Sequence, residues 1–171
     1  DVCSSDLGLL LCFLRLQFCD EFRKYFYILK KYQEAILDLN QSMAIDSTNE
    51  EGFFYRGSAY YSLNQYQQAI EDYSSAIRVL PNYLEAYYYR GSAKYQLEKY
   101  NDAIEDFTKT VQLDSNYYFG YFFRGNAKYF LNNFEEAIID YDKAMKINNE
   151  LPSVYYYKGR ALYDLEKYKE A

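Results

Sequence analysis

The chain has 171 residues, of which half are apolar and 21% are aromatic, including 24 tyrosines and 12 phenylalanines. Its formal net charge of −6 argues against nucleic acid as the principal partner, because contact with the phosphate backbone requires a basic surface. The sequence contains no histidine, the commonest metal ligand and general base, so no metal or other cofactor is expected.

The N-terminal segment differs in composition from the rest of the chain. Residues 1–7 are what results from translating GAC GTG TGC TCT TCC GAT CT, which resembles the end of a common sequencing adapter. We therefore interpret residues 1–15 as an artefact or a disordered, apolar leader outside the folded part. The apolar run from Leu7 to Leu14 is too short to span a bilayer, which takes about 20 residues, so no membrane contact is expected. A signal-peptide core is the alternative, although no basic segment precedes the run.

All three cysteines lie within the first 19 residues, which favours a reducing compartment such as the cytoplasm.

A basic residue followed by glycine returns every 34 residues, as Arg56-Gly57, Arg90-Gly91, Arg124-Gly125 and Lys158-Gly159. A fixed period of this length is typical of a solenoid, because one repeat alone cannot bury its apolar face and needs its neighbours. Units are expected to begin near Glu50, Leu84, Tyr118 and Pro152, with a degenerate unit near Leu16. The array then divides into residues 16–49, 50–83, 84–117, 118–151 and a truncated unit over 152–171.

Each unit is expected to form a pair of antiparallel helices. In the second unit the apolar positions predict a first helix, a turn at 97–100 and a second helix from about Tyr100 to Leu113. In the last unit we expect a first helix over 154–165 and the beginning of a second at 168–171. Polar residues and a proline at the junctions are expected to supply turns and helix N-caps, namely Pro81, Asn82, Ser115, Asn116 and Asn149.

Two periodic features predict contacts inside each helix pair. Glycine within a helix costs about 1 kcal/mol relative to alanine, so its recurrence implies that the second helix packs closely against it. We expect each glycine to face the small residue of the second helix, at Ala35, Ala69, Ala103, Ala137 and Ala171.

An arginine also precedes an aspartate by 16 residues in three units, as Arg56 and Asp72, Arg90 and Asp106, Arg124 and Asp140. An ion pair across the hairpin would explain this spacing, and drift within a recently duplicated repeat would explain it equally well.

These residues resemble the tetratricopeptide repeat family, whose 34-residue unit carries an aromatic, glycine, tyrosine, alanine, aromatic, alanine and proline pattern. The resemblance covers Leu16 to Ala171, with the first aromatic at Phe53, Tyr87, Tyr121 and Tyr155 and the second at Tyr73, Phe107 and Tyr141. Thr110 departs from the pattern at a small-residue position, and the junction proline occurs only as Pro81. The resemblance implies an all-α fold, a right-handed superhelical solenoid of antiparallel helix hairpins.

The resemblance also implies a concave groove lined by three positions in the first helix of each unit. Stacked units would align their aromatic side chains into ladders, which offer large apolar contacts with hydroxyl groups to a protein or peptide partner. Some of these aromatic side chains are instead expected to pack between neighbouring units. The candidate peptide-binding residues are Phe54, Ser58, Tyr61, Tyr88, Ser92, Tyr95, Phe122, Asn126, Tyr129, Tyr156, Arg160 and Tyr163.

A protein-interaction module that binds an extended or helical segment is therefore the predicted function. Part of the family holds the carboxylate of chaperone tails with lysine, asparagine and arginine, but the matching positions here are Phe54, Ser58, Tyr89, Phe119 and Phe123. No phosphate-binding loop or cluster of metal ligands appears, so the chain is not expected to be an enzyme. One alternative is a structural scaffold that stacks or self-associates, for example through an uncapped C-terminal end. Another is the regulatory arm of a larger enzyme.

Overall fold

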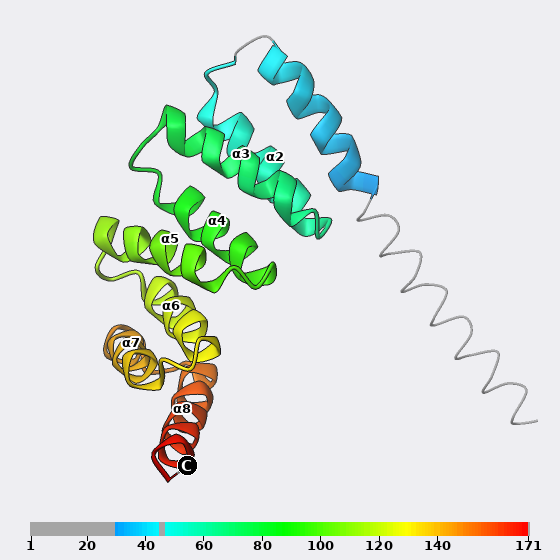
Figure 1. The fold of residues 1–171 in the computed structure, drawn as a ribbon. Helices are drawn as coiled ribbons and strands as arrows, with labels where there is room; N and C mark the ends of the chain where they lie inside the picture. Colours follow the sequence, from blue (N-terminus) through cyan, green and yellow to red (C-terminus); the bar gives the residue numbers. More distant parts are fainter. Residues whose placement is uncertain (1–29, 45–46, 171) are drawn as a thin grey trace, which may run out of the picture.

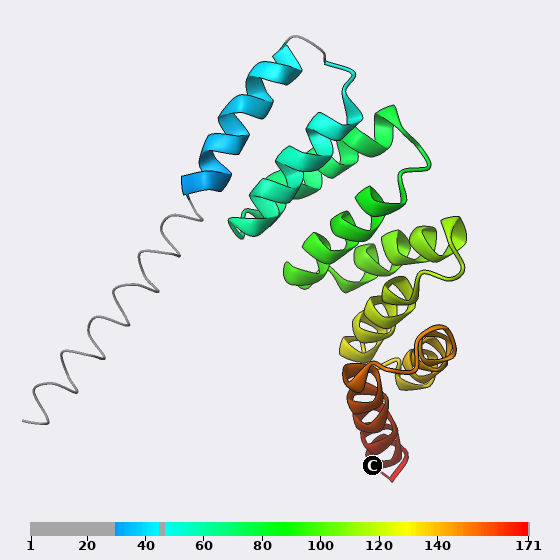
Figure 2. The same cartoon turned by 180° about the vertical axis from the view of Figure 1, so that it is seen from behind.

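The computed structural model describes residues 30–44 and 47–170, so the expectations for the leader and for the first helix of the degenerate unit lie outside the described residues. Within this part the chain forms helices and no strands, which confirms the prediction of an all-α solenoid of helix hairpins. The helices follow one another along a curved stack (Figures 1 and 2). None of the described helices is long and apolar enough to cross a membrane. A helix over residues 30–44 is followed by α2 (Glu50–Ser62), α3 (Tyr66–Val79), α4 (Leu84–Gln96), α5 (Tyr100–Leu113), α6 (Tyr118–Phe130), α7 (Phe134–Ile147) and α8 (Pro152–Glu170).

The stack has an inner layer made of first helices and an outer layer made of second helices. Each helix from α2 to α8 packs against its sequence neighbours, and the first helices α2, α4, α6 and α8 also contact one another in succession. The second helices α3, α5 and α7 make no such contacts among themselves. Because the layer whose members approach one another lies on the inside of a curve, the first helices form the concave side.

Each hairpin turns at one residue in the left-handed region, a conformation that is uncommon for residues other than glycine. These residues are Asn64, Glu98 and Asn132, with φ between 58° and 61°. In the second hairpin the amide of Glu98 donates to the Tyr95 carbonyl at 2.9 Å, and the amide of Lys99 donates to the Lys94 carbonyl at 2.9 Å. This pair of bonds is a Schellman motif, which satisfies carbonyl groups that the end of the helix would otherwise leave unpaired.

The turn expected after Leu165 does not form, and α8 continues as one helix through Glu170. Glu166 occupies the position of Glu98 but keeps a helical conformation. A left-handed residue costs about 1–2 kcal/mol, which in the other units is offset by burial of the second helix. No second helix packs on α8 among the described residues, so continuing the helix is more favourable. The separate short helix expected from Tyr168 is therefore wrong for residues 168–170, and Ala171 lies outside the described residues.

The expected N-caps are also mostly absent. The helices α4 and α6 begin after Tyr83 and Tyr117, and neither residue makes a side-chain cap. Asn116 contributes its backbone instead, because its amide donates to the Asp114 carboxylate at 2.8 Å in a local turn. At the start of α2, by contrast, the side chain of Asn49 accepts a hydrogen bond from the Gly52 amide at 2.8 Å. The junctions before α4 and α6 therefore place a tyrosine where a capping side chain was expected.

The recurrent glycines are sites of close approach, but the alanines are not their nearest neighbours. The nearest atoms belong to the second-helix aromatic rings, which are fully buried. A Cβ added at Gly91 would lie 2.9 Å from the ring of Phe107, and one added at Gly125 would lie 2.7 Å from the ring of Tyr141. At Gly159 no atom lies within 4 Å. The glycine therefore makes room for a ring, which is larger than the methyl group that the sequence suggested.

The departure at Thr110 is accommodated inside the second hairpin. Its side chain is fully buried, and its hydroxyl donates to the Asp106 carbonyl at 3.0 Å. A buried hydroxyl without a partner would be unfavourable, so this bond explains why threonine can replace alanine there.

Candidate functional site

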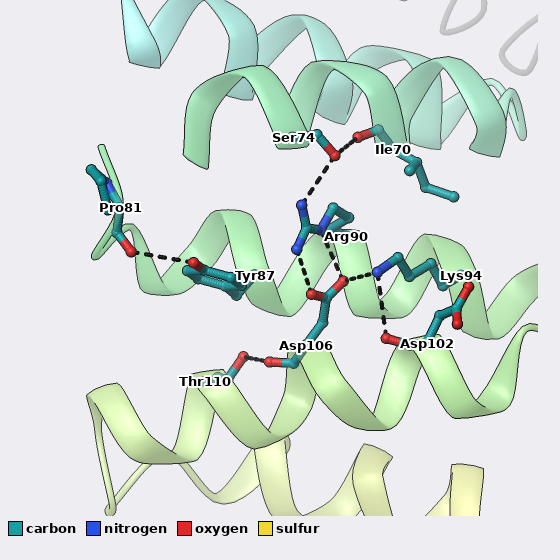
Figure 3. A network of polar contacts seen from close by, with 9 residues as sticks. All are labelled: Ile70, Ser74, Pro81, Tyr87, Arg90, Lys94, Asp102, Asp106 and Thr110. Carbon is teal, nitrogen blue, oxygen red and sulfur yellow. Dashed lines mark hydrogen bonds and ion pairs between the residues drawn. The ribbon is translucent and has the colours of Figure 1, made fainter. Parts of the chain in front are cut away.

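A buried ion pair holds together each of the three complete hairpins that the structure describes. In the second hairpin Arg90 donates to the carboxylate of Asp106 through Nε at 2.9 Å and Nη2 at 2.6 Å (Figure 3). The Nζ of Lys94 lies 2.8 Å from the same carboxylate. The two-pronged contact matches the planar geometry of both groups and is stronger than a single bond. Equivalent pairs join Arg56 to Asp72 and Arg124 to Asp140, so the predicted ion pair across the hairpin is confirmed.

The same arginines also connect each unit to the one before it, a contact that the sequence analysis missed. The Nη1 of Arg90 donates to the hydroxyl of Ser74 on the preceding second helix at 3.1 Å (Figure 3). Each bond reaches a polar residue 16 positions earlier, a periodic signal that could have predicted it. The acceptors are Asn40 for Arg56, Ser74 for Arg90, Thr108 for Arg124 and Asp142 for Lys158. These bonds fix one unit against the next and so support a defined groove.

An aromatic residue of each following unit packs between the aromatic side chains of the preceding groove positions. Tyr89 lies 5.7 Å from Phe54, 6.4 Å from Tyr61 and 6.1 Å from Tyr73, measured between ring centroids. Phe123 makes the corresponding contacts with Tyr88, Tyr95 and Phe107. Such edge and stacked contacts each contribute about 0.5–1.5 kcal/mol beyond area burial. Much of the aromatic content therefore joins the units to one another.

The predicted binding residues differ in how much of each side chain the concave side exposes. Asn126 is buried, and its side-chain oxygen accepts a hydrogen bond from the hydroxyl of Tyr141 at 2.9 Å. Exposure is greatest on α8, because no further helix in the described part of the chain covers its side chains. Ser92, Phe122, Asn126 and Tyr129 are buried; Phe54, Ser58, Tyr61, Tyr88 and Tyr95 are half-buried; Tyr156, Arg160 and Tyr163 are exposed.

A first hollow of about 320 Å³ lies between the first and second complete units. Three of the predicted residues line it together, namely Phe54, Ser58 and Tyr61. The other four lining residues were not among the predicted binding residues, because they belong to different registers of the repeat. These are Tyr55, Ser62, Tyr73 and Tyr89. We refer to these seven residues as the aromatic hollow.

A second hollow of about 490 Å³ lies toward the C-terminal end, and two of the predicted residues, Tyr129 and Arg160, line it. The hydroxyl of Tyr129 donates to the carboxylate of Asp164, and the guanidinium of Arg160 lies 5.2 Å from the Tyr129 ring centroid. Burial, and then this contact with Asp164, raises the pKa of Tyr129. Lys167 adds a second cation, so we call this site the charged hollow. The remaining predicted residues line neither hollow.

The three half-buried groove tyrosines are neutral near pH 7. Burial is the main cause that raises the pKa of Tyr61, Tyr88 and Tyr95 above the ordinary tyrosine value. Their rings and hydroxyls are therefore available for apolar contact and hydrogen bonding. Within residues 30–44 and 47–170 no group of three or more histidine, cysteine or acidic side chains is placed to hold a metal ion. The two hollows thus differ in charge: the aromatic hollow is lined by uncharged side chains, and the charged hollow by two cations and one carboxylate.

Comparison with known proteins agrees with the fold. The family model described as TPR repeat matches residues 57–98 and 125–166, and the one described as Tetratricopeptide repeat matches residues 84–117. No curated protein sequence gives a significant match.

Several solved structures share the fold. MamA from Desulfovibrio magneticus RS-1 is 19% identical with a TM-score of 0.77, over 86% of this chain and 87% of that one. The first TPR of Spaghetti (RPAP3), solved bound to the HSP90 peptide SRMEEVD, is 25% identical with a TM-score of 0.68, over 71% of this chain and 96% of that one. The Arabidopsis OM64 TPR domain is 25% identical with a TM-score of 0.64, over 66% of this chain and 93% of that one.

Proposed function

Because the chain belongs to the tetratricopeptide repeat family, we propose that it is a protein-interaction module whose concave groove binds an extended or helical segment of a partner. The observation that carries this proposal is the aromatic hollow, where three groove positions meet in a concavity of about 320 Å³. A concave, mostly apolar site with a few polar groups is the usual form of a binding pocket. The peptide bound to the first TPR of RPAP3 supports the same use of a similar fold.

The proposed partner is a protein or peptide and not nucleic acid. Several first-helix cations that a phosphate backbone would need are already paired: Arg90 and Lys94 with Asp106, and Lys128 with Asp140. The positions matching a chaperone-tail clamp carry aromatic side chains and a serine, so the bound segment need not end in a free carboxylate. We propose no catalytic activity for the chain. We propose a cytoplasmic location, in line with the absence of cysteine after residue 19.

A peptide-display selection followed by measured affinities tests the proposal. Tyr61→Ala removes one wall of the aromatic hollow and should weaken binding of a selected peptide by about tenfold or more, as expected for an anchor in a groove. Tyr155→Ala is the matched control, because Tyr155 is exposed on α8 and lines neither hollow. Circular dichroism should show both variants folded. Failure to select any peptide, or equal affinities for Tyr61→Ala and the parent, would contradict the proposed groove.

Self-association is a second candidate, favoured by one face of α8. Tyr155 is 49% exposed and Leu162 is 45% exposed, and nothing lies within 4 Å of the Cβ position of Gly159 between them. In the other units the corresponding face packs on a second helix. An open apolar face of this kind promotes association. Sedimentation of the chain and of a Leu162→Lys variant tests this: a parent that is monomeric at high concentration would remove self-association as a candidate.

A further inference from the structure

We propose that the aromatic hollow binds the cationic side chain of a lysine or arginine, presented by an extended segment of a basic partner. This inference rests on the proposed function and names the chemistry that the groove recognises. Three independent properties of the lining residues point to a cation: the ring faces, the direction of the hydroxyl hydrogens and the distribution of charge.

Aromatic side chains dominate the wall of the hollow. Its five rings belong to Phe54, Tyr55, Tyr61, Tyr73 and Tyr89. The face of an aromatic ring carries negative charge in its quadrupole, so an ammonium or guanidinium group within about 6 Å of the ring centroid is attracted to it. Tyr55 is more than half exposed, so its ring is accessible to a side chain that enters from solvent.

Three of the six hydroxyl groups that line the hollow donate their hydrogens inside the protein and so present acceptors to it. Tyr73 donates its hydrogen to Ser58 at 3.2 Å, and Ser58 donates its own to the Phe54 carbonyl at 2.9 Å. Ser62 donates to the Ser58 carbonyl at 2.9 Å. All three hydrogens are thus used within the protein, and only oxygen lone pairs are left. Lysine and arginine side chains carry donors and no acceptors, which complements this arrangement.

The charge around the hollow also favours a cation. Among the described residues that line it there is no lysine or arginine. Tyr83 lies beside the hollow, 5.1 Å from Phe54, and burial followed by the nearby carboxylates of Glu85 and Glu51 raises its pKa to about 12. The neighbouring Arg56 and Arg90 are neutralised by buried aspartates. A positively charged side chain would therefore meet a neutral to negative site on a chain of net charge −6.

The charged hollow provides an internal contrast within the same protein. Arg160 and Lys167 line it together with a single carboxylate, Asp164, which already accepts the hydroxyl of Tyr129. A further cation, brought by a partner, would be repelled there. A basic peptide should therefore distinguish the two hollows, whereas an apolar peptide would have no electrostatic reason to do so.

The experiment is a titration of the 15N-labelled 171-residue chain with blocked pentapeptides Gly-Ser-X-Ser-Gly, followed by NMR. X is lysine, arginine, norleucine or glutamate. Norleucine has the four-carbon side chain of lysine without the ammonium group. We expect the lysine and arginine peptides to shift the amides of Gly57, Ser58 and Tyr89, with affinities about three- to tenfold higher than that of norleucine. Glutamate should bind most weakly. Equal binding of norleucine, tighter binding of glutamate, or lysine-induced shifts confined to the charged hollow would overturn the inference.

Two variant pairs test the mechanism without removing residues from the packed interior. Tyr55→Leu should lose most of the preference for lysine over norleucine, while Tyr55→Phe should keep it, because phenylalanine retains the ring face. Glu85→Gln should lower the affinity for lysine and its dependence on salt, while Glu105→Gln on the exposed side of α5 should change neither. Lysine affinity that is unchanged in both Tyr55→Leu and Glu85→Gln would also overturn the inference. If display selection yields neutral or acidic peptides that depend on Tyr61, the proposed function stands and this inference fails.

Discussion

The opposite surroundings of two equivalent glycines predict opposite effects of the same substitution. An alanine Cβ at position 125 would lie 2.7 Å and 2.9 Å from two ring carbons of Tyr141 and 3.3 Å from the Ala137 carbonyl oxygen. The ring cannot easily move, because it is fully buried and its hydroxyl is bonded to Asn126. At position 159 the same Cβ would have nothing within 4 Å.

The magnitudes follow from two effects of opposite sign. Alanine stabilises a helix by about 1 kcal/mol relative to glycine, at either position. At position 125 overpacking costs roughly 2–3 kcal/mol, near the upper end of the usual range, because the contact is with a ring that is held in place. We therefore expect Gly125→Ala to lower the free energy of unfolding by about 1–2 kcal/mol and Gly159→Ala to raise it by about 1 kcal/mol.

Urea denaturation followed by circular dichroism at 222 nm measures both variants against the parent. The dependence of the free energy on urea concentration should stay the same, so that a shift in midpoint reports stability. Hydrogen exchange of the α6 and α7 amides then shows whether the loss at position 125 is local, as expected in a repeat protein. A Gly125→Ala variant at least as stable as Gly159→Ala would refute close packing against Tyr141.

Three further predictions concern the buried polar groups. Asp106→Ala should lower the free energy of unfolding by about 3 kcal/mol in chemical denaturation, because Arg90 and Lys94 lose their shared carboxylate. A loss below about 1 kcal/mol would show the pair to be a solvated surface contact. Tyr141→Phe should cost about 1–2 kcal/mol by leaving the buried amide of Asn126 without its donor. Adding Asn126→Ser should recover part of that loss, since the second unit uses phenylalanine and serine at these two positions, and a further loss in the double variant would contradict this pairing. Burial raises the folded-state pKa of Tyr83 and Tyr117 to about 12 from an unfolded value of 10.0, so their stabilising contribution is complete below pH 10 and is lost as pH rises through 12. Above pH 10 the helical signal in circular dichroism should fall as the tyrosinate absorbance rises. Tyrosinate formation that is complete before any loss of helix would contradict this prediction.

The sequence alone determined the features that depend on local order along the chain. The 34-residue period, the α-helical class and the second-unit helix from Tyr100 to Leu113 follow from the amphipathic pattern, which reports which face of each helix is buried. The spacing of Arg90 and Asp106 was compatible with an ion pair, because a hairpin brings positions 16 residues apart to the same level. Periodicity alone could not distinguish an ion pair from drift within a duplicated repeat. The 2.6 Å distance between Arg90 Nη2 and the Asp106 carboxylate shows the ion pair.

The tertiary structure decided what each repeated residue contacts beyond its own helix. The ring of Phe107 fills the space beside Gly91 because the two helices cross where the larger side chain reaches the missing Cβ, a geometry that sequence spacing does not contain. Arg90 reaches back to Ser74, and Tyr89 enters the preceding unit, because the stacking angle brings those helices together. Packing likewise decided where α8 ends. Leucine, glutamate and lysine occur at 97–99 and again at 165–167, but only the first set forms a turn. A second helix packs on that hairpin, and burial of the second helix offsets the cost of the left-handed residue.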